Sequence, residues 1–169
     1  MDVTMLRGSC LCGGVRYEIS GKLYRALNCH CSMCRKAHGA AFRSRATVRS
    51  SDFRLVSGDH LLTFFESSRG NHRGFCRVCG SPIVSKFDAY PSVLGLPLGA
   101  LDDDPGVRLQ LHVYVAYKAP WFAITDDLPQ FAEGPPPSST SAAGSDPPAK
   151  PVKSSDNRDE EGEIGGGAA

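Results

Sequence analysis

Seven cysteines carry most of the chemistry that this sequence can do, and all of them lie within the first 79 of its 169 residues. They form three short groups: Cys10 and Cys12; Cys29, Cys31 and Cys34; Cys76 and Cys79. An odd number of cysteines, without an export signal at the N-terminus, argues against a disulfide framework. Cysteines separated by one or two residues form chelating groups for zinc. The pattern therefore predicts a zinc protein.

The first and third groups predict one closed zinc site. Gly13 and Gly14 follow the first group and Gly80 follows the third, and glycine can adopt the positive φ that turns backbone amides toward sulfur. Structural zinc sites have four ligands. Here the four would be Cys10, Cys12, Cys76 and Cys79. Because the two halves are far apart along the chain, this zinc would tie the N-terminal strand to the middle of the molecule.

The middle group predicts a second zinc with an open position. Cys29, Cys31 and Cys34 supply three ligands, and an open fourth position is the usual mark of a catalytic zinc. Alternation along a strand end would place Cys29 and Cys31 on one face. Ser32 is the predicted N-cap of a short helix that Gly39 ends, with Cys34 in the first turn, where the helix dipole favours a thiolate.

Two histidines near this group allow different interpretations. His38 follows Cys34 by four residues and could close the second site as a fourth ligand. The chain would then be a non-catalytic zinc-binding interaction module with two structural zinc sites. His30 lies between two ligands but points to the opposite strand face, so it is predicted to be a packed or solvent-facing residue and not a ligand.

Outside the cysteine groups, the sequence up to residue 133 predicts short strands. Alternation of apolar and polar residues predicts strands near residues 15–19, 53–56, 61–65 and 109–115. Turn signals separate them, and no segment beyond the turn at Ser32 has a sustained helical period. We therefore expect residues 6–133 to form a mainly β, small zinc-stabilised domain of short antiparallel strands with little helix.

Residues 134–169 differ sharply in composition. They contain six Gly, six Pro and six Ser and no aromatic residue, so they cannot bury enough apolar surface to offset the entropy of ordering them. We expect a disordered acidic tail. It holds six acidic and three basic residues, which leaves the body with a formal charge of +4. That mild excess does not indicate a nucleic-acid partner.

The sequence also predicts a location and two further roles. No apolar run approaches the roughly 18 residues of a membrane span, and without an export signal the cytoplasm is the default compartment. Trp121 is predicted to be a core anchor in preference to a ligand-pocket residue. Arg43, Arg45 and Arg49 alternate, so they form either a solvated strand face or a grip for a carboxylate.

Four segments carry a pattern found in a known family. They are residues 8–17 (GSCLCGGVRY), 29–36 (CHCSMCRK), 75–81 (FCRVCGS) and 118–121 (KAPW). In type and order they resemble the glutathione-dependent formaldehyde-activating enzyme family, which also includes centromere protein V. The resemblance covers about residues 6–133 and leaves the tail outside.

The resemblance implies a β-tent fold with two zinc ions per chain. One would be structural and held by Cys10, Cys12, Cys76 and Cys79. The other would be the active-site zinc on Cys29, Cys31 and Cys34. The activity that the resemblance implies is the joining of glutathione to formaldehyde to give S-hydroxymethylglutathione, which is a carbon–sulfur lyase reaction in reverse. The partners would be a small-molecule thiol such as glutathione and a small aldehyde, and the substrate could also be another small electrophile.

The chemistry of the second site can also be argued from its ligands. A zinc with an open position could hold an incoming thiol as thiolate or polarise a carbonyl oxygen. Three thiolates leave the zinc centre with a charge of −1, which makes it a weak Lewis acid and favours the thiolate route. Arg43 and Lys36 are the residues expected, from charge and proximity, to contact glutathione.

Overall fold

The computed structural model describes residues 5–134 and is mainly β, with one short α-helix. This confirms the predicted fold class. The predicted disordered tail at residues 134–169 lies, apart from Gly134, outside the described residues.

Three strands form a small antiparallel sheet in the order β1-β2-β5. They are β1 (Leu6–Ser9), β2 (Arg16–Ile19) and β5 (Phe53–Ser57). The predicted strands at residues 15–19 and 53–56 correspond to β2 and β5. The ring of Tyr17 is buried across Gly8, where a Cβ atom would overlap it. Tyr17 Oη donates a hydrogen bond to the Ala100 carbonyl at 2.9 Å, so this sheet is joined to the segment that follows β9 (Val93–Pro97) of the large sheet.

Seven strands form the large sheet, in the order β10-β3-β4-β9-β8-β7-β6. They are β3 (Tyr24–Cys29), β4 (Arg43–Arg49), β6 (Leu62–Ser68), β7 (Asn71–Cys76), β8 (Pro82–Phe87), β9 (Val93–Pro97) and β10 (His112–Val113). Every neighbouring pair is antiparallel except β10 and β3, which run parallel.

The strand predicted at residues 109–115 is therefore much shorter than expected. Only His112–Val113 pairs as a strand, and Tyr114 ends it by adopting a left-handed φ of 58°. The preceding residues follow β3 through single backbone bonds, such as Gln110 N–H to the Ala26 carbonyl at 3.0 Å. This edge strand covers the end of β3 that leads into the middle cysteine group.

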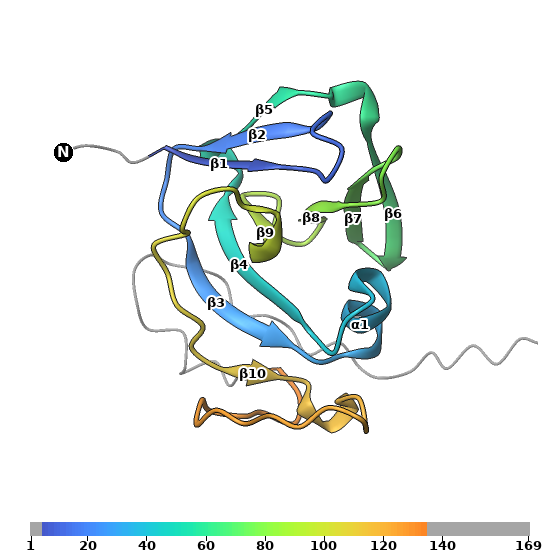
Figure 1. Cartoon of the computed structure of the whole chain (residues 1–169), viewed down its shortest axis with the longest axis vertical. Coiled ribbons are helices and arrows are strands. Elements are labelled where there is room, and N and C mark those ends of the chain that lie inside the picture. The colour runs from blue at the N-terminus through green and yellow to red at the C-terminus, as the bar shows by residue number, and fades with distance from the viewer. Residues whose placement is uncertain (1–4, 135–169) are drawn as a thin grey trace, which may run out of the picture.

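The sheets curve around a common interior, with α1 (Ser32–His38) at one side (Figure 1). In that view the small sheet lies at the top, β3 and β4 at the lower left, β6 and β7 at the right, and β10 with the chain that follows it at the bottom. Three short 3₁₀ helices lie between strands of the described residues: η1 (Ser50–Asp52), η2 (Asp59–Leu61) and η3 (Leu98–Ala100). A fourth, η4 (Val115–Tyr117), follows β10.

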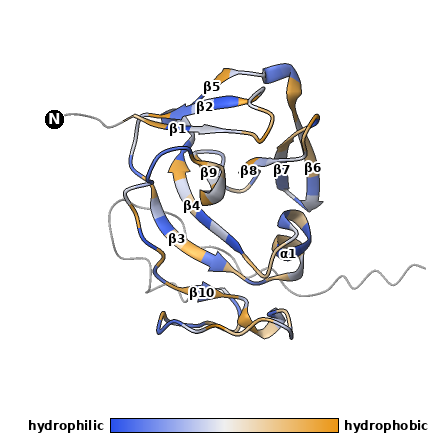
Figure 2. Cartoon of the chain, viewed as in Figure 1, coloured by the Kyte–Doolittle hydropathy of each residue, from blue (hydrophilic) through white to orange (hydrophobic). Residues whose placement is uncertain are grey.

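Two hydrophobic clusters hold the fold together. The larger contains Ile19, Ile83 and Leu96, each fully buried, together with Cys10 and Cys76. Burying each such aliphatic side chain contributes about 1.5–3 kcal/mol. The smaller consists of Leu27, Cys29, Cys34 and Val113. Hydrophobic and hydrophilic residues interleave along β3 and β4 (Figure 2). Each hydrophobic cluster therefore contains two cysteines of one cysteine group: Cys10 and Cys76 in the larger, and Cys29 and Cys34 in the smaller.

Within residues 5–134, no helix combines the length and the apolar character needed to cross a membrane.

Candidate metal centres

Cys10, Cys12, Cys76 and Cys79 come together as the spacing predicted. Their four sulfurs lie within 4.8 Å of one another. The Cys10 and Cys12 sulfurs are 3.4 Å apart, and the Cys12 and Cys76 sulfurs are 3.8 Å apart although 64 positions separate the two residues. The group could hold a metal ion, and it would then join the β1–β2 loop to the β7–β8 turn.

Glycines with positive φ shape both halves of this cluster. Gly80 has a φ of 74°, as predicted, and its N–H donates to the Cys76 carbonyl at 2.8 Å. Gly13 has a φ of 73°, and its N–H donates to the Cys10 carbonyl at 2.8 Å. The tight turn brings the Val15 N–H within 3.2 Å of the Cys10 sulfur. Backbone amides therefore face thiolates here, which stabilises their charge.

Ser81 links the two halves. Its hydroxyl oxygen accepts a hydrogen bond from the Leu11 N–H at 2.9 Å and lies 3.3 Å from the Cys79 sulfur. Hydrogen bonds with the side chain and backbone of Ser81 lower the pKa of Cys79 to about 5. Cys79 is thus a thiolate at neutral pH, the form that binds metal.

Cys29, Cys31 and Cys34 form the second cluster. Their sulfurs also lie within 4.8 Å of one another, and those of Cys29 and Cys31 are 3.6 Å apart. Among residues 5–134, no histidine or carboxylate joins the group, so His38 stands outside it. This cluster offers three protein ligands and no fourth.

The chain turns from strand to helix within this cluster. β3 ends at Cys29, and Cys31 is the N-cap of α1, its sulfur accepting a hydrogen bond from the Cys34 N–H at 3.4 Å. The prediction that Ser32 caps the helix was wrong, because the sulfur one residue earlier takes that role. Gly39 ends the helix with a φ of 57°, as predicted. A metal ligand therefore also fixes the helix start.

Two arginines lie beside the three-cysteine cluster. Arg43 sits opposite Cys29 in the β3–β4 register and is buried. Its guanidinium donates to Ser85 Oγ at 3.0 Å and to the Gly95 carbonyl at 3.2 Å. Arg73 on β7 donates from Nη2 to the Cys34 sulfur at 3.6 Å. In the described part of the chain, neither arginine forms an ion pair with a carboxylate.

The groups around Cys34 favour its thiolate form, whereas hydrogen bonds with the Cys31 and Cys34 side chains, and burial, raise the pKa of Cys29. Hydrogen bonds with the Cys29 and Cys31 thiols and the positive charges of Arg73 and Arg43 lower the pKa of Cys34. Burial lowers the pKa of Arg43 to about 10, so this guanidinium stays charged at neutral pH. Burial, and then the charge of Arg43, lower the pKa of His38 to about 4. His38 is therefore neutral at physiological pH.

Other predicted residues have different surroundings than expected. Arg43 is buried while Arg49 is exposed, so the alternating arginines do not form one solvated strand face. Lys36 is exposed on α1. The prediction that Trp121 is a core anchor was wrong, since 72% of its surface is exposed. The neighbouring Phe122 takes the inward position and packs edge-to-face on Phe42.

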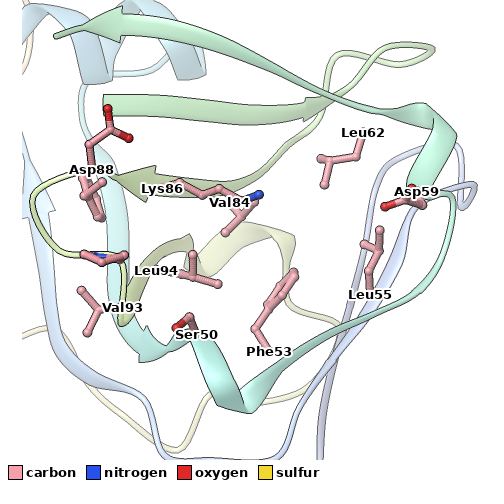
Figure 3. A pocket seen from close by; sticks show the side chains of 12 residues that line it. Ser50, Phe53, Leu55, Asp59, Leu62, Val84, Lys86, Asp88, Val93 and Leu94 are labelled. Atoms are coloured by element: carbon pink, nitrogen blue, oxygen red, sulfur yellow. The ribbon is translucent and has the colours of Figure 1, made fainter. Parts of the chain in front are cut away.

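A separate cavity of about 500 Å³ opens between β5, β6, β8 and β9 (Figure 3). Apolar side chains, including Phe53 and Leu94, line most of it, together with the charged side chains of Asp59, Lys86 and Asp88, and no cysteine is among its lining residues. Val84 and Lys86 face the cavity, so alternation along β8 directs Ser85 to the other face, where Arg43 holds it. The cavity and the three-cysteine cluster therefore lie on opposite faces of β8.

The fold and the two clusters together define a small β protein with two cysteine centres, one of four sulfurs and one of three. The model of the family described as glutathione-dependent formaldehyde-activating enzyme matches residues 5–117, and the chain belongs to that family. This agrees with the resemblance carried by the cysteine motifs.

Two individual proteins are also similar. A protein of Halomonas elongata, whose name carries a provisional assignment to the glutathione-dependent formaldehyde-activating enzymes, is 27% identical over 127 residues, covering 71% of this chain and 81% of the relative. The crystal structure of a Rhodobacter sphaeroides protein, a structural genomics target, is 33% identical with a TM-score of 0.47. The match covers 60% of this chain and 90% of that one.

Proposed function

We propose that this chain is a zinc-dependent carbon–sulfur lyase that works in the direction of addition. It joins the thiol of glutathione, or of a related small molecule, to formaldehyde or a related small aldehyde. The observation that carries the proposal is the three-cysteine cluster, which lies beside two guanidiniums. Among residues 5–134, the cluster has no fourth protein ligand and the guanidiniums have no carboxylate partner. Membership of the formaldehyde-activating family supports the same chemistry.

The sulfur separations fit zinc at both clusters. Zinc–thiolate bonds of about 2.3 Å in a tetrahedron place sulfurs about 3.8 Å apart. The separations of 3.4, 3.8 and 3.6 Å are close to that value. Cys10, Cys12, Cys76 and Cys79 would hold a structural zinc, and Cys29, Cys31 and Cys34 the active-site zinc. A zinc with an open position stabilises the thiolate form of a bound thiol near neutral pH.

Arg73 and Arg43 supply positive charge where the incoming sulfur must become anionic. Three thiolates and one divalent ion carry a net charge of −1, and the two guanidiniums carry +2. The centre can therefore accept one more negative charge, such as the thiolate of a substrate. Arg73 already donates to the Cys34 sulfur. The sulfur of a thiol bound beside Cys34 would therefore also be stabilised by the positive charge of this guanidinium.

The proposed reaction balances without an oxidant or a reductant. The substrate sulfur forms a bond to the carbonyl carbon, and the electron pair of the broken carbonyl π bond moves to oxygen. The proton released by the thiol ends on that oxygen, giving a hydroxymethyl thioether. The reverse direction breaks the carbon–sulfur bond and returns the aldehyde.

Replacing Cys31 by Ser tests the proposal. Cys31→Ser removes one of three ligands, so we expect metal analysis to find one zinc per chain in place of two and the formation of the glutathione–formaldehyde adduct to fall to background. The four-cysteine site and the fold should be retained, as measured by circular dichroism.

Ser32→Ala is the matched control, since Ser32 is the exposed first residue of α1 and directly follows Cys31. It should keep both metals and the activity. A Cys31→Ser protein that retained two zinc ions would contradict the assignment of ligands. A wild-type protein with two zinc ions and no activity on thiols and aldehydes would instead favour a non-catalytic zinc module.

A further inference from the structure

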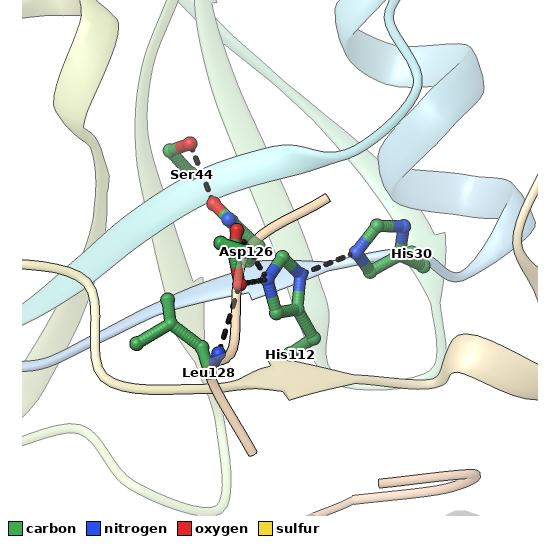
Figure 4. A network of polar contacts seen from close by, with 6 residues as sticks. His30, Ser44, His112, Asp126 and Leu128 are labelled. Carbon is green, nitrogen blue, oxygen red and sulfur yellow. Dashed lines mark hydrogen bonds and ion pairs between the residues drawn. The ribbon is translucent and has the colours of Figure 1, made fainter. Parts of the chain in front are cut away.

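A chain of polar side chains runs from the three-cysteine cluster to the surface (Figure 4). His30, between Cys29 and Cys31, is fully buried, and its Nε2 lies 2.8 Å from Nδ1 of His112. Nε2 of His112 lies 3.1 Å from both carboxylate oxygens of Asp126. Asp126 in turn accepts the Leu128 N–H at 3.0 Å. The chain thus links β3, β10 and the segment after η4.

The direction of these hydrogen bonds is set by the carboxylate. An ionised carboxylate only accepts, so Nε2 of His112 donates to Asp126. In the tautomer that carries its proton on Nε2, His112 presents Nδ1 as an acceptor, and Nε2 of His30 donates to it. Each ring is therefore held in one tautomer and one orientation, in the way that carboxylate–histidine pairs orient groups around metals.

Backbone bonding and packing hold the same residues. The His30 N–H donates to the Val113 carbonyl at 3.0 Å, and β10 pairs Val113 with Cys29. The His30 ring packs against Phe42, with centroids 5.1 Å apart, and against Phe122 at 6.2 Å. His30 cannot shift without moving the cysteines bonded to it on either side.

We propose that His112 and Asp126 are positioning residues for the three-cysteine centre. Through His30 they hold Cys29 and Cys31 in the arrangement that binds a metal with three protein ligands. The inference rests on the proposed occupancy of this cluster by zinc and does not depend on which substrate is used. Asp126 lies beyond residues 5–117, the range that the family model matches, so the chain supplies this support from a segment outside that range.

The test is a chelator competition on the full-length, zinc-loaded protein, because it measures each site without any activity assay. Asp126 is half exposed, so Asp126→Leu should not disturb the core. We expect this variant to lose zinc from the three-cysteine site at about tenfold lower chelator concentration, with release from the four-cysteine site unchanged. Cys31→Ser identifies which of the two release phases belongs to the three-cysteine site.

Two variants separate positioning from general effects. Asp127→Leu removes the same charge from the neighbouring exposed position and should release zinc like the wild type. Asp126→Asn keeps an oxygen acceptor for His112 and should recover most of the lost affinity. The inference is overturned if Asp126→Leu weakens both sites equally or neither, if Asp127→Leu has the same effect, or if the wild type holds one zinc only. A wild type with two zinc ions and no thiol–aldehyde activity overturns the proposed function alone.

Discussion

Arg73 is the residue whose contact with the three-cysteine cluster most directly concerns the chemistry. It lies on β7 and donates from Nη2 to the Cys34 sulfur at 3.6 Å. Hydrogen bonds between charged partners contribute about 1.5–3 kcal/mol. A guanidinium in this place stabilises each negative charge that the centre acquires, including that of a bound thiol.

Replacing Arg73 by Gln should therefore weaken thiol binding. Calorimetric titration of the zinc-loaded protein with glutathione should show an affinity lower by at least about tenfold, in line with the loss of one charge-assisted hydrogen bond. Arg69→Gln is the control, because Arg69 is an exposed arginine in the turn that precedes β7. Equal affinities for the Arg73→Gln protein and the wild type would show that this guanidinium does not act on the bound thiol.

The cysteines of the site could be predicted from sequence, but their surroundings could not. Ligand spacing is a local property, so the division of seven cysteines into four and three was readable along the chain. Arg73 and His112 reach the second cluster through strand pairing, 39 and 82 positions away from their partners Cys34 and His30. No local pattern encodes such a contact, and this is why both were missed.

The 3₁₀ helix η2 is the element that joins the two sheets beside the four-cysteine cluster. Gly58 precedes it with a φ of 80°, and a Cβ atom there would overlap the Gly14 carbonyl oxygen. Leu61, at the end of η2, accepts the Arg77 N–H on its carbonyl at 2.8 Å. The turn therefore packs against both halves of that cluster and needs a residue without a side chain.

Gly58→Ala should destabilise the protein by about 2 kcal/mol or more, because the left-handed backbone and the overlap with Gly14 both disfavour a side chain. Urea unfolding of the zinc-loaded protein measures the change. Gly99→Ala is the matched control, since an added Cβ at Gly99 meets no atom within 4 Å, and its effect should stay within about 0.5 kcal/mol. Similar midpoints for the two variants would refute the packing argument.

At the scale of elements, alternation predicted β2, β5 and β6, but at β4 it left open whether the arginines form a solvated strand face or a grip for a carboxylate. The sequence of β4, RSRATVR, places charged residues at alternate positions, which is typical of a solvated strand face. In the sheet, however, β4 lies between β3 and β9, and Arg43 turns inward, where its Nη1 and Nη2 donate to Ser85 Oγ and to the Gly95 carbonyl. The partners of Arg43 lie on other strands, so the sequence of β4 alone does not distinguish this buried arginine from a surface residue.

For the whole molecule, we propose that residues 6–133 are the complete folding unit. Its two hydrophobic clusters, and both cysteine clusters, lie within this range. The end of the range is bonded to β10 and to the residue after it: the Phe131 N–H donates to the His112 carbonyl, and the Tyr114 N–H donates to the Glu133 carbonyl, both at 2.9 Å.

A chain truncated after Gly134 should then fold and bind metal like the full chain. We expect the same zinc content and a midpoint of thermal unfolding within a few degrees, because no contact of residues 5–134 described above is removed. Differential scanning calorimetry of the two zinc-loaded proteins makes the comparison. A large loss of stability on truncation would place the boundary of the folding unit further along the chain.

The central claim is that the chain holds one closed metal site and one that responds to thiols. It is tested most directly by measuring zinc per chain on protein purified under reducing conditions, with and without glutathione, and by following how readily each ion exchanges. The account predicts two zinc ions, of which the one on Cys29, Cys31 and Cys34 becomes labile when glutathione is added. Two ions that both remain inert to glutathione would contradict it and would point to two closed structural sites.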